Sequence, residues 1–261
     1  MTAASTPAGP SASPEPTGIL NSALKRRAQD RFSGTLRIDG GQDGTVTMSD
    51  GLVIAAATPA SPGPESLLLR SGRISDDEWT EAFAAAAPAG RMPAELVDRE
   101  LLGSAGLQVL TQVAVMDAVF AMALSGIQTC TAMPAGEDDL APLLPSDPGI
   151  EVDRLLRETA RRLITAVEWR PLGLHIHSRP QRAHELADPP VNASRADVLA
   201  KVNGRRTVRD IAFVLGRGIF SVMNDLAVLA QNGHVTFQAL RAESKPKPDP
   251  TRRPDQASAR T

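Results

Sequence analysis

The chain is poor in aromatic residues and in cysteine. It has 261 residues and no tyrosine, and aromatic residues make up only 3% of it. Its core must therefore rely on leucine, valine, isoleucine and alanine. The single cysteine, Cys130, excludes an internal disulfide and a cysteine-based zinc site, and it favours a reducing cytoplasm. No neighbouring base would activate this thiol, so we expect Cys130 to be inert.

Signals for export and for membrane insertion are also missing. Residues 1–18 have neither the basic stretch nor the apolar core of a secretory signal. Residues 107–127 are apolar enough to raise the question of a membrane span, but Gln108, Gln112 and Asp117 interrupt them. Polar groups are costly at bilayer depth, so we expect an amphipathic core helix and no membrane partner.

Residues that could carry catalysis or hold a metal do not cluster. Asp76 and Asp77 follow a serine at helix-capping distance, so their position is explained by the positive end of a helix. His175 and His177 could bind a metal only with a third ligand, and His184 is the one nearby candidate. No glycine-rich phosphate loop leads into a helix. The sequence therefore predicts no enzyme, no cofactor and no metal site.

The stretch that best defines the fold is residues 32–57. Apolar residues alternate with polar ones around Leu36 and Ile38, and again around Val46 and Met48, as in half-buried strands. Glycines between and after these runs suit hairpin turns. We expect a meander of three antiparallel strands. Helices and a further strand are expected around it, at residues 19–30, 65–70, 76–87, 94–102 and 104–125, and at 127–132.

The segment after residue 150 predicts a connecting helix and strand. Residues 150–168 have an apolar helical face, from which Arg157, Arg161 and Arg162 are offset. This helix connects the domains or mediates homodimerisation, and both interpretations stay open. Residues 172–177 read as a strand. The apolar helical face comprises Val152, Leu155, Leu156, Leu163, Ile164 and Val167.

Residues 194–238 have the pattern of a winged helix-turn-helix. Ser194 and Thr207 are expected to cap the first two of three helices, and residues 235–237 read as the first strand of a small wing. The apolar positions of the helices predict one core. Its members would be Val198, Val202, Val208, Ile211, Ala212, Leu215, Val222, Leu226 and Leu229.

Charge is divided unevenly between the two parts of the chain. Residues 1–190 carry 16 Lys and Arg against 24 Asp and Glu, whereas residues 191–261 carry 12 against 6. This asymmetry favours either an acidic partner such as DNA or a solvated basic tail. The third helix has no Lys or Arg, so base readout looks poor. The residues that could bind nucleic acid or a protein partner are Arg205, Arg206, Arg209, Arg217 and Asn224.

Together these patterns predict an α+β fold, with a small antiparallel meander packed by helices and a C-terminal winged helix-turn-helix. The expected divisions are a disordered tail at 1–17, an α+β domain at 18–133, a Pro-rich acidic linker at 134–149, a connecting helix and strand at 150–190, the winged-helix domain at 191–240 and a disordered basic tail at 241–261.

Three blocks in order resemble the PatA-type N-terminal domain family of bacterial signalling proteins. They are FSGTLRI at 32–38, SDGLVIAAA at 49–57 and LLLRSGRISDDEW at 67–79, and the resemblance covers about residues 19–132. The chain departs from the family at Ile127, Thr129 and Thr131, where aromatic residues are usual. The resemblance implies a non-enzymatic domain of unknown function that accompanies receiver domains or small GTPase systems, and it supplies no catalytic residues.

Residues 197–218 are similar to the winged-helix tail of actinobacterial proteins described as transcriptional regulators. We therefore expect a cytoplasmic signalling adaptor whose N-terminal domain receives a protein partner and whose winged helix gives the output. The alternative is a DNA-binding transcriptional regulator.

Overall fold

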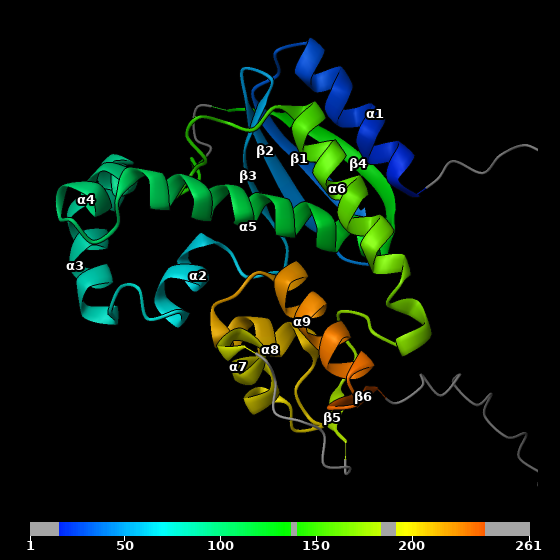
Figure 1. Cartoon of the computed structure of the whole chain (residues 1–261). Helices are drawn as coiled ribbons and strands as arrows, with labels where there is room; N and C mark the ends of the chain where they lie inside the picture. Colours follow the sequence, from blue (N-terminus) through cyan, green and yellow to red (C-terminus); the bar gives the residue numbers. More distant parts are fainter. Residues whose placement is uncertain (1–15, 137–139, 184–191, 238–261) are drawn as a thin grey trace, which may run out of the picture.

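The computed structural model describes residues 16–136, 140–183 and 192–237, and it shows a mixed α+β fold (Figure 1). This confirms the predicted fold class. Most of the two predicted tails, and also His184, lie outside the described ranges. Helix α1, Pro16–Gln29, already begins within the range predicted as the N-terminal tail.

The predicted meander is confirmed and forms most of the main sheet. Its strands are antiparallel, and a fourth strand joins beside the first, so that the order is β3-β2-β1-β4. Between the second and third strands, Asp50 and Gly51 both have positive φ, which a tight hairpin turn requires. The strands are β1 (Gly34–Gly40), β2 (Gly44–Ser49), β3 (Leu52–Ala57) and β4 (Ile127–Pro134).

One face of this sheet carries the core. Leu36, Ile38, Val46 and Met48 are all buried, whereas the residues that alternate with them are more exposed. Helices α1, α5 (Ser104–Ser125) and α6 (Val152–Val167) cover the buried face (Figure 1). The bounds of α5 are those the sequence predicted, because Gly126 ends it with a positive φ of 85°.

A second layer of short helices packs against the first half of α5. Ser75 and Glu78 form the predicted capping box at the start of α3, with backbone-to-side-chain distances of 3.2 and 2.8 Å. The helix predicted at 94–102 is shifted toward the N-terminus, because Pro93 suits a first turn and Glu100 has a positive φ. The helices are α2 (Pro64–Arg70), α3 (Asp76–Ala86) and α4 (Met92–Asp98), with a 3-10 turn at Ala87–Ala89.

The described part of the predicted linker, residues 134–136 and 140–149, leads back to the sheet. Ser146 donates its backbone N–H to the carbonyl of Ile54 at 2.7 Å, and Ile150 exchanges two backbone hydrogen bonds with Val53. Leu144 is buried in the core beside α2 and α5. The end of this segment is therefore part of the packed N-terminal module.

Two predictions about the connecting segment are wrong. Ile164 and Val167 of α6 are 70% and 54% exposed, whereas Arg162, assigned to the polar side, is buried. The reason is that the side of α6 that carries Arg162 faces α5. There the carboxylate of Asp117 neutralises the charge of Arg162. Residues 172–177 form no strand, because a 3-10 turn at Arg170–Leu172 ends in left-handed Gly173 and tight turns follow.

The C-terminal module contains the three expected helices. The turn from the second helix to the third bends the chain by 118°, which is helix-turn-helix geometry. Thr207 caps the second helix as predicted, but Asn192 rather than Ser194 caps the first. The helices are α7 (Ala193–Lys201), α8 (Val208–Leu215) and α9 (Ile219–Gln231).

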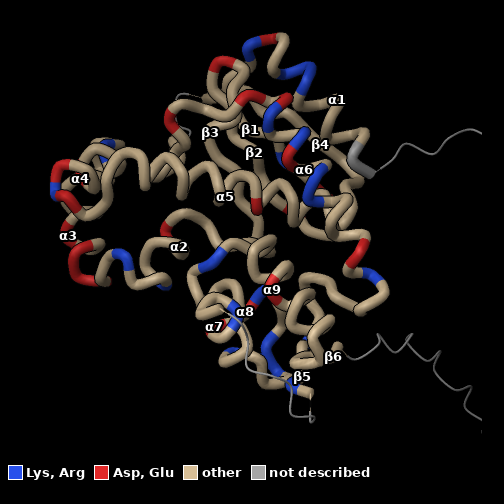
Figure 2. The backbone as a smooth tube through the Cα atoms, in the orientation of Figure 1, with Lys and Arg blue, Asp and Glu red and all other residues tan. Residues whose placement is uncertain are grey.

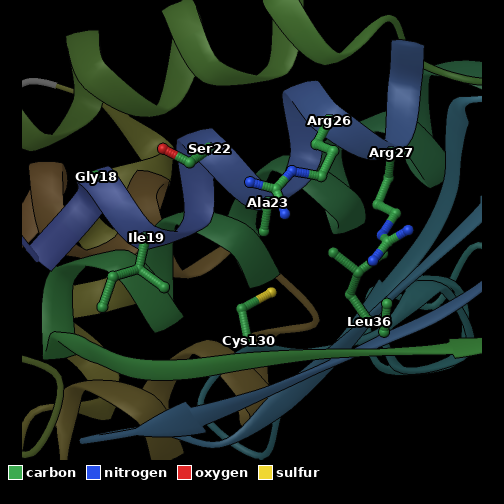
Figure 3. Close-up of a pocket in the computed structure, with 9 residues that line it drawn as sticks. Gly18, Ile19, Ser22, Ala23, Arg26, Arg27, Leu36 and Cys130 are labelled. Carbon is green, nitrogen blue, oxygen red and sulfur yellow. The ribbon is translucent and has the colours of Figure 1, made fainter. Parts of the chain in front are cut away.

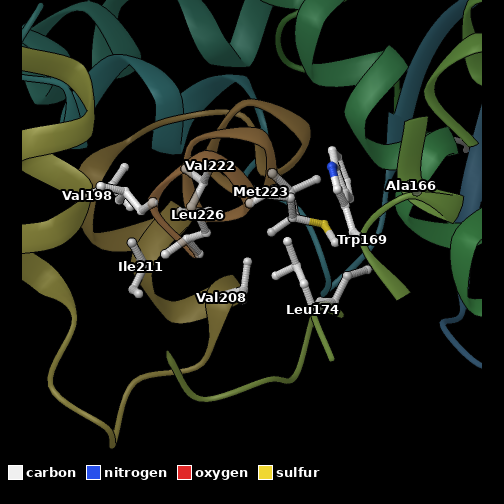
Figure 4. Packing of buried hydrophobic residues seen from close by; sticks show 14 of the residues in the cluster. Ala166, Trp169, Leu174, Val198, Val208, Ile211, Val222, Met223 and Leu226 are labelled. Atoms are coloured by element: carbon white, nitrogen blue, oxygen red, sulfur yellow. The ribbon is translucent and has the colours of Figure 1, made fainter. Parts of the chain in front are cut away.

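The predicted wing strand pairs with a strand that comes earlier in the sequence. Strand β6, Val235–Phe237, pairs antiparallel with β5, Pro180–Arg182, which precedes the three helices. All predicted core residues of this module are buried except Leu215, which is half-buried. Figure 4 shows Val198, Ile211 and Leu226 among the packed side chains, and Trp169 of the preceding segment beside Met223.

One of the hydrophobic clusters spans the two modules. Phe120 and Ala121 of α5 belong to the same buried cluster as Met223 of α9. Figure 1 shows α9 lying under α5 and α6. By length and composition α5 could cross a membrane, but most of it is buried between the sheet, the short helices and α9. The packing thus explains its apolar character.

Candidate functional site

The structure separates the five residues predicted to bind nucleic acid or a partner. Arg205 and Arg206 lie in the turn between α7 and α8, where both backbone N–H groups donate to the side-chain oxygen of Asn203, at 3.0 and 2.9 Å. Arg205 is exposed, and Arg206 reaches the carbonyl of Lys201 at 3.4 Å. Of the five predicted residues, only these two arginines lie next to each other on one surface.

Strand β5 adds basic residues to that surface. Gly204 donates its N–H to the carbonyl of Pro180 at 3.0 Å, and Arg182 donates to the carbonyl of Leu199 at 2.9 Å. Figure 2 shows Lys and Arg gathered near β5 and α8. Within the described residues, none of the four cations forms a salt bridge. We call this set, Arg182, Lys201, Arg205 and Arg206, the basic surface.

Arg209 serves the contact between modules. Its Nε donates to the carbonyl of Pro59, in the loop after β3, and its guanidinium lies 4.6 Å from the centre of the Phe213 ring. Its Nη1 is 3.5 Å from a carboxylate oxygen of Asp210. Arg209 is therefore held by the N-terminal module and by α8.

Arg217 lies just before α9 and Asn224 lies within it, and the two side chains have different neighbours. Arg217 pairs with the Asp225 carboxylate at 2.7 Å and also donates to Ser221 and to the carbonyl of Ser194. These bonds tie the start of α9 to α7 and hold the Arg217 guanidinium within the C-terminal module. Asn224 is exposed on the outer side of α9.

The start of α9 is packed against the N-terminal module. The Phe220 ring meets Phe120 of α5 edge to face, with ring centres 5.2 Å apart, and it lies 5.5 Å from the centre of Trp169. The Arg162 guanidinium sits over the same ring at 4.8 Å. Ile219 is fully buried. Ile219 and Phe220 thus face the N-terminal module, whereas Ser221 of the same turn is exposed.

A buried carboxylate lies at this junction. Asp117 of α5 is 3% exposed and pairs through Oδ1 with Nη1 of Arg162, which is 9% exposed. Gly218, the residue before α9, lies so close to Oδ2 that a side chain there would collide with it. Arg162 in turn donates Nε to Glu158 at 2.7 Å. We call Asp117, Glu158 and Arg162 the junction cluster.

Burial and pairing act in opposite directions on the two acids. Burial raises the pKa of Asp117, although Arg162 and the first amides of α9 favour its charged form. The pKa of Glu158 falls to about 2, chiefly because its carboxylate accepts hydrogen bonds from Arg161, and also from Arg162. Arg162 therefore bonds both carboxyl groups, and that of Asp117 lies at the N-terminus of α9.

The histidines do not form a metal site in the described part of the chain. The His175 ring accepts from the backbone N–H of His177, and the His177 ring lies 2.9 Å from the amide of Gln42 at the tip of the β1–β2 hairpin. Burial and the neighbouring His177 lower the pKa of His175. These side chains join the hairpin to the connecting segment.

Sequence reasoning missed the junction cluster. Asp117 appeared only as a polar interruption of an apolar helix, and Arg162 as a surface cation. The available signal was a single acid in the middle of an apolar helix, since such an acid needs a buried partner. Comparison of the chain with family models, curated proteins and solved structures finds no match.

Proposed function

We propose that this chain is a non-enzymatic, cytoplasmic signalling regulator of bacterial type. Its N-terminal α+β module receives a protein partner, and its C-terminal helix-turn-helix module gives the output. The similarity of residues 19–132 to the PatA-type domain supports a signalling protein as that partner. Several charged groups in the described residues act as ion pairs and helix caps, which are structural roles.

The observation that carries this proposal is the packing of one face of the first turn of α9, at Ile219 and Phe220, against the N-terminal module. In helix-turn-helix readers, the N-terminal residues of the second motif helix contact the base edges. Here that turn packs against Phe120 and Trp169, and the carboxylate of Asp117 lies at the same end. The N-terminal module therefore covers this face of the helix while the modules stay packed. A partner that alters the packing of α5 would therefore control what the C-terminal module exposes.

A matched pair of glycine substitutions tests this coupling. Gly218 and Gly103 both precede a helix with extended backbone, at φ −59° and −67°, but only Gly218 touches the Asp117 carboxylate. Gly218→Ala should loosen the junction, and Gly103→Ala should not, because nothing lies near its new side chain. Hydrogen exchange should then show faster exchange across the first turn of α9 in Gly218→Ala alone.

The partner half of the proposal needs a separate experiment. Photo-crosslinking in cells, from positions on the N-terminal module, should identify one recurrent protein that also binds the purified chain. Its binding should change hydrogen exchange at the start of α9. A partner that leaves exchange there unchanged would contradict transmission through the junction.

DNA binding is a second candidate function, supported by the basic surface. Four cations that form no salt bridge with the described residues lie near a helix-turn-helix, where they suit phosphate contacts and predict salt-dependent affinity. Fluorescence anisotropy with duplex DNA should be compared for the natural chain and Arg205→Ala/Arg206→Ala. Arg73→Ala/Arg91→Ala, which removes two exposed arginines of the other module, is the control. If both variants lose the same amount of DNA affinity, the binding reflects only general charge attraction.

A further inference from the structure

Strand β4 forms an open edge of the main sheet. The strand order is β3-β2-β1-β4, and within the described residues no strand pairs with the outer side of β4. At the other edge, Ile150 and Ser146 bond to the backbone of β3. Figure 1 shows β4 at the margin of the sheet. Among residues 16–136, 140–183 and 192–237, the backbone thus covers one edge of the sheet and forms no strand along the other.

Hydrogen bonding to β1 identifies which groups of β4 point outward. Beyond the end of β4, Ala135 donates its N–H to the carbonyl of Ser33 at 3.1 Å. Backbone directions alternate along an antiparallel strand, so Thr131 turns its backbone groups toward β1. Cys130 and Ala132 therefore turn their N–H and C=O groups outward, where a further strand could bind them.

Apart from one irregularity near Gln128, where the register with β1 shifts, this edge has few of the features that normally prevent strand pairing. Proteins protect open edges with charged residues, prolines or covering segments. Strand β4 contains no charged residue, and its one proline, Pro134, is its last residue. Met133 exposes 46% of its surface beside it. The strand is therefore an available template for another strand.

The sequence of β4 is complementary to itself. Suppose that two copies pair antiparallel about a two-fold axis at Cys130. Thr129 of each copy then lies opposite Thr131 of the other, and threonine pairs are favourable cross-strand neighbours. Because the strand is uncharged, two copies meet without repulsion. We propose that β4 pairs with β4 of a second copy of this chain, which makes one continuous sheet across a homodimer.

A groove beside the edge extends the surface that a second copy would cover. It lies between α1 and β4 and has a volume of about 490 Å³. Ile19 and Ala23 of α1 line it together with Cys130 of β4, as Figure 3 shows. Arg26 and Arg27 of α1 also line the groove, so a second copy would gain hydrophobic stabilisation only where it covers the apolar part of the lining.

Two double variants that differ at one position test both the proposed dimer and the register of its β4–β4 pairing. Thr129 donates to Asp39 and Thr131 lies beside Arg37, all on the exposed face of the sheet. Thr129→Lys/Thr131→Lys sets lysine opposite lysine in the dimer, whereas Thr129→Lys/Thr131→Glu sets lysine opposite glutamate. We expect the first to raise the dimer dissociation constant about tenfold or more and the second to preserve the dimer.

Sedimentation velocity over a concentration series measures the dissociation constant, and hydrogen exchange supplies a second measurement. In the dimer the amides of Cys130 and Ala132 gain protection with rising concentration, while that of Thr131, bonded within the sheet, is protected throughout. Circular dichroism confirms that both variants fold. A natural chain that stays monomeric up to on the order of 100 µM would overturn the proposal. So would a dimer that both variants leave intact.

Discussion

The junction cluster makes a quantitative prediction about the buried charge of Asp117. Arg162→Met removes its cation and keeps an apolar side chain of similar length against Phe220. An unpaired buried charge typically costs about 3–5 kcal/mol of unfolding free energy. The first amides of α9 still favour the carboxylate. We therefore expect a loss of about 3 kcal/mol at neutral pH.

A second substitution should restore part of this loss. Asp117→Asn alone should cost about 1–2 kcal/mol, because Arg162 keeps its bond to Glu158 at 2.7 Å. In Asp117→Asn/Arg162→Met no buried charge remains. The double variant should thus be more stable than Arg162→Met alone by at least about 1 kcal/mol, although it carries one more substitution.

Urea unfolding at pH 7.5 and pH 5 measures both effects. Burial already raises the pKa of Asp117, and loss of Arg162 raises it further. The destabilisation of Arg162→Met is present above this raised pKa and is relieved as acid protonates the carboxyl group. The difference in unfolding free energy between Arg162→Met and the natural chain should therefore be smaller at pH 5 than at pH 7.5. If the two single losses simply add in the double variant, Asp117 does not depend on Arg162 and the junction cluster is misassigned.

Three further predictions follow from single sites. The pKa of Glu158 falls from 4.5 to about 2, so the stability that its charged form contributes is full above pH 4.5 and is lost as the pH drops toward 2. In Glu158→Gln the unfolding free energy should therefore depend less on pH in this range. Ser75→Ala removes a capping box and should cost about 1 kcal/mol, with faster amide exchange at the start of α3. Gly216→Ala should lower the melting temperature, because Gly216 has φ 57° and touches the backbone at Arg70, whereas Gly103→Ala should not.

The sequence by itself determined the elements that depend on neighbours in the chain. Alternation and glycine turns placed the meander, since period and turn chemistry are local properties. Ser75 and Thr207 marked two helix starts because a capping side chain bonds amides three residues away. The same logic gave the bounds of α5 and the core of the C-terminal module.

Only the tertiary structure decided how these elements meet. Arg162 looks like a surface residue until Asp117, 45 positions earlier, neutralises it. Strand β6 pairs with β5 rather than with a following strand, and Arg209 binds the carbonyl of Pro59 rather than facing a ligand. Each outcome depends on partners far away in sequence, and side-chain type alone cannot specify them. The open edge of β4 likewise exists because the main sheet orders its strands with β4 outside β1.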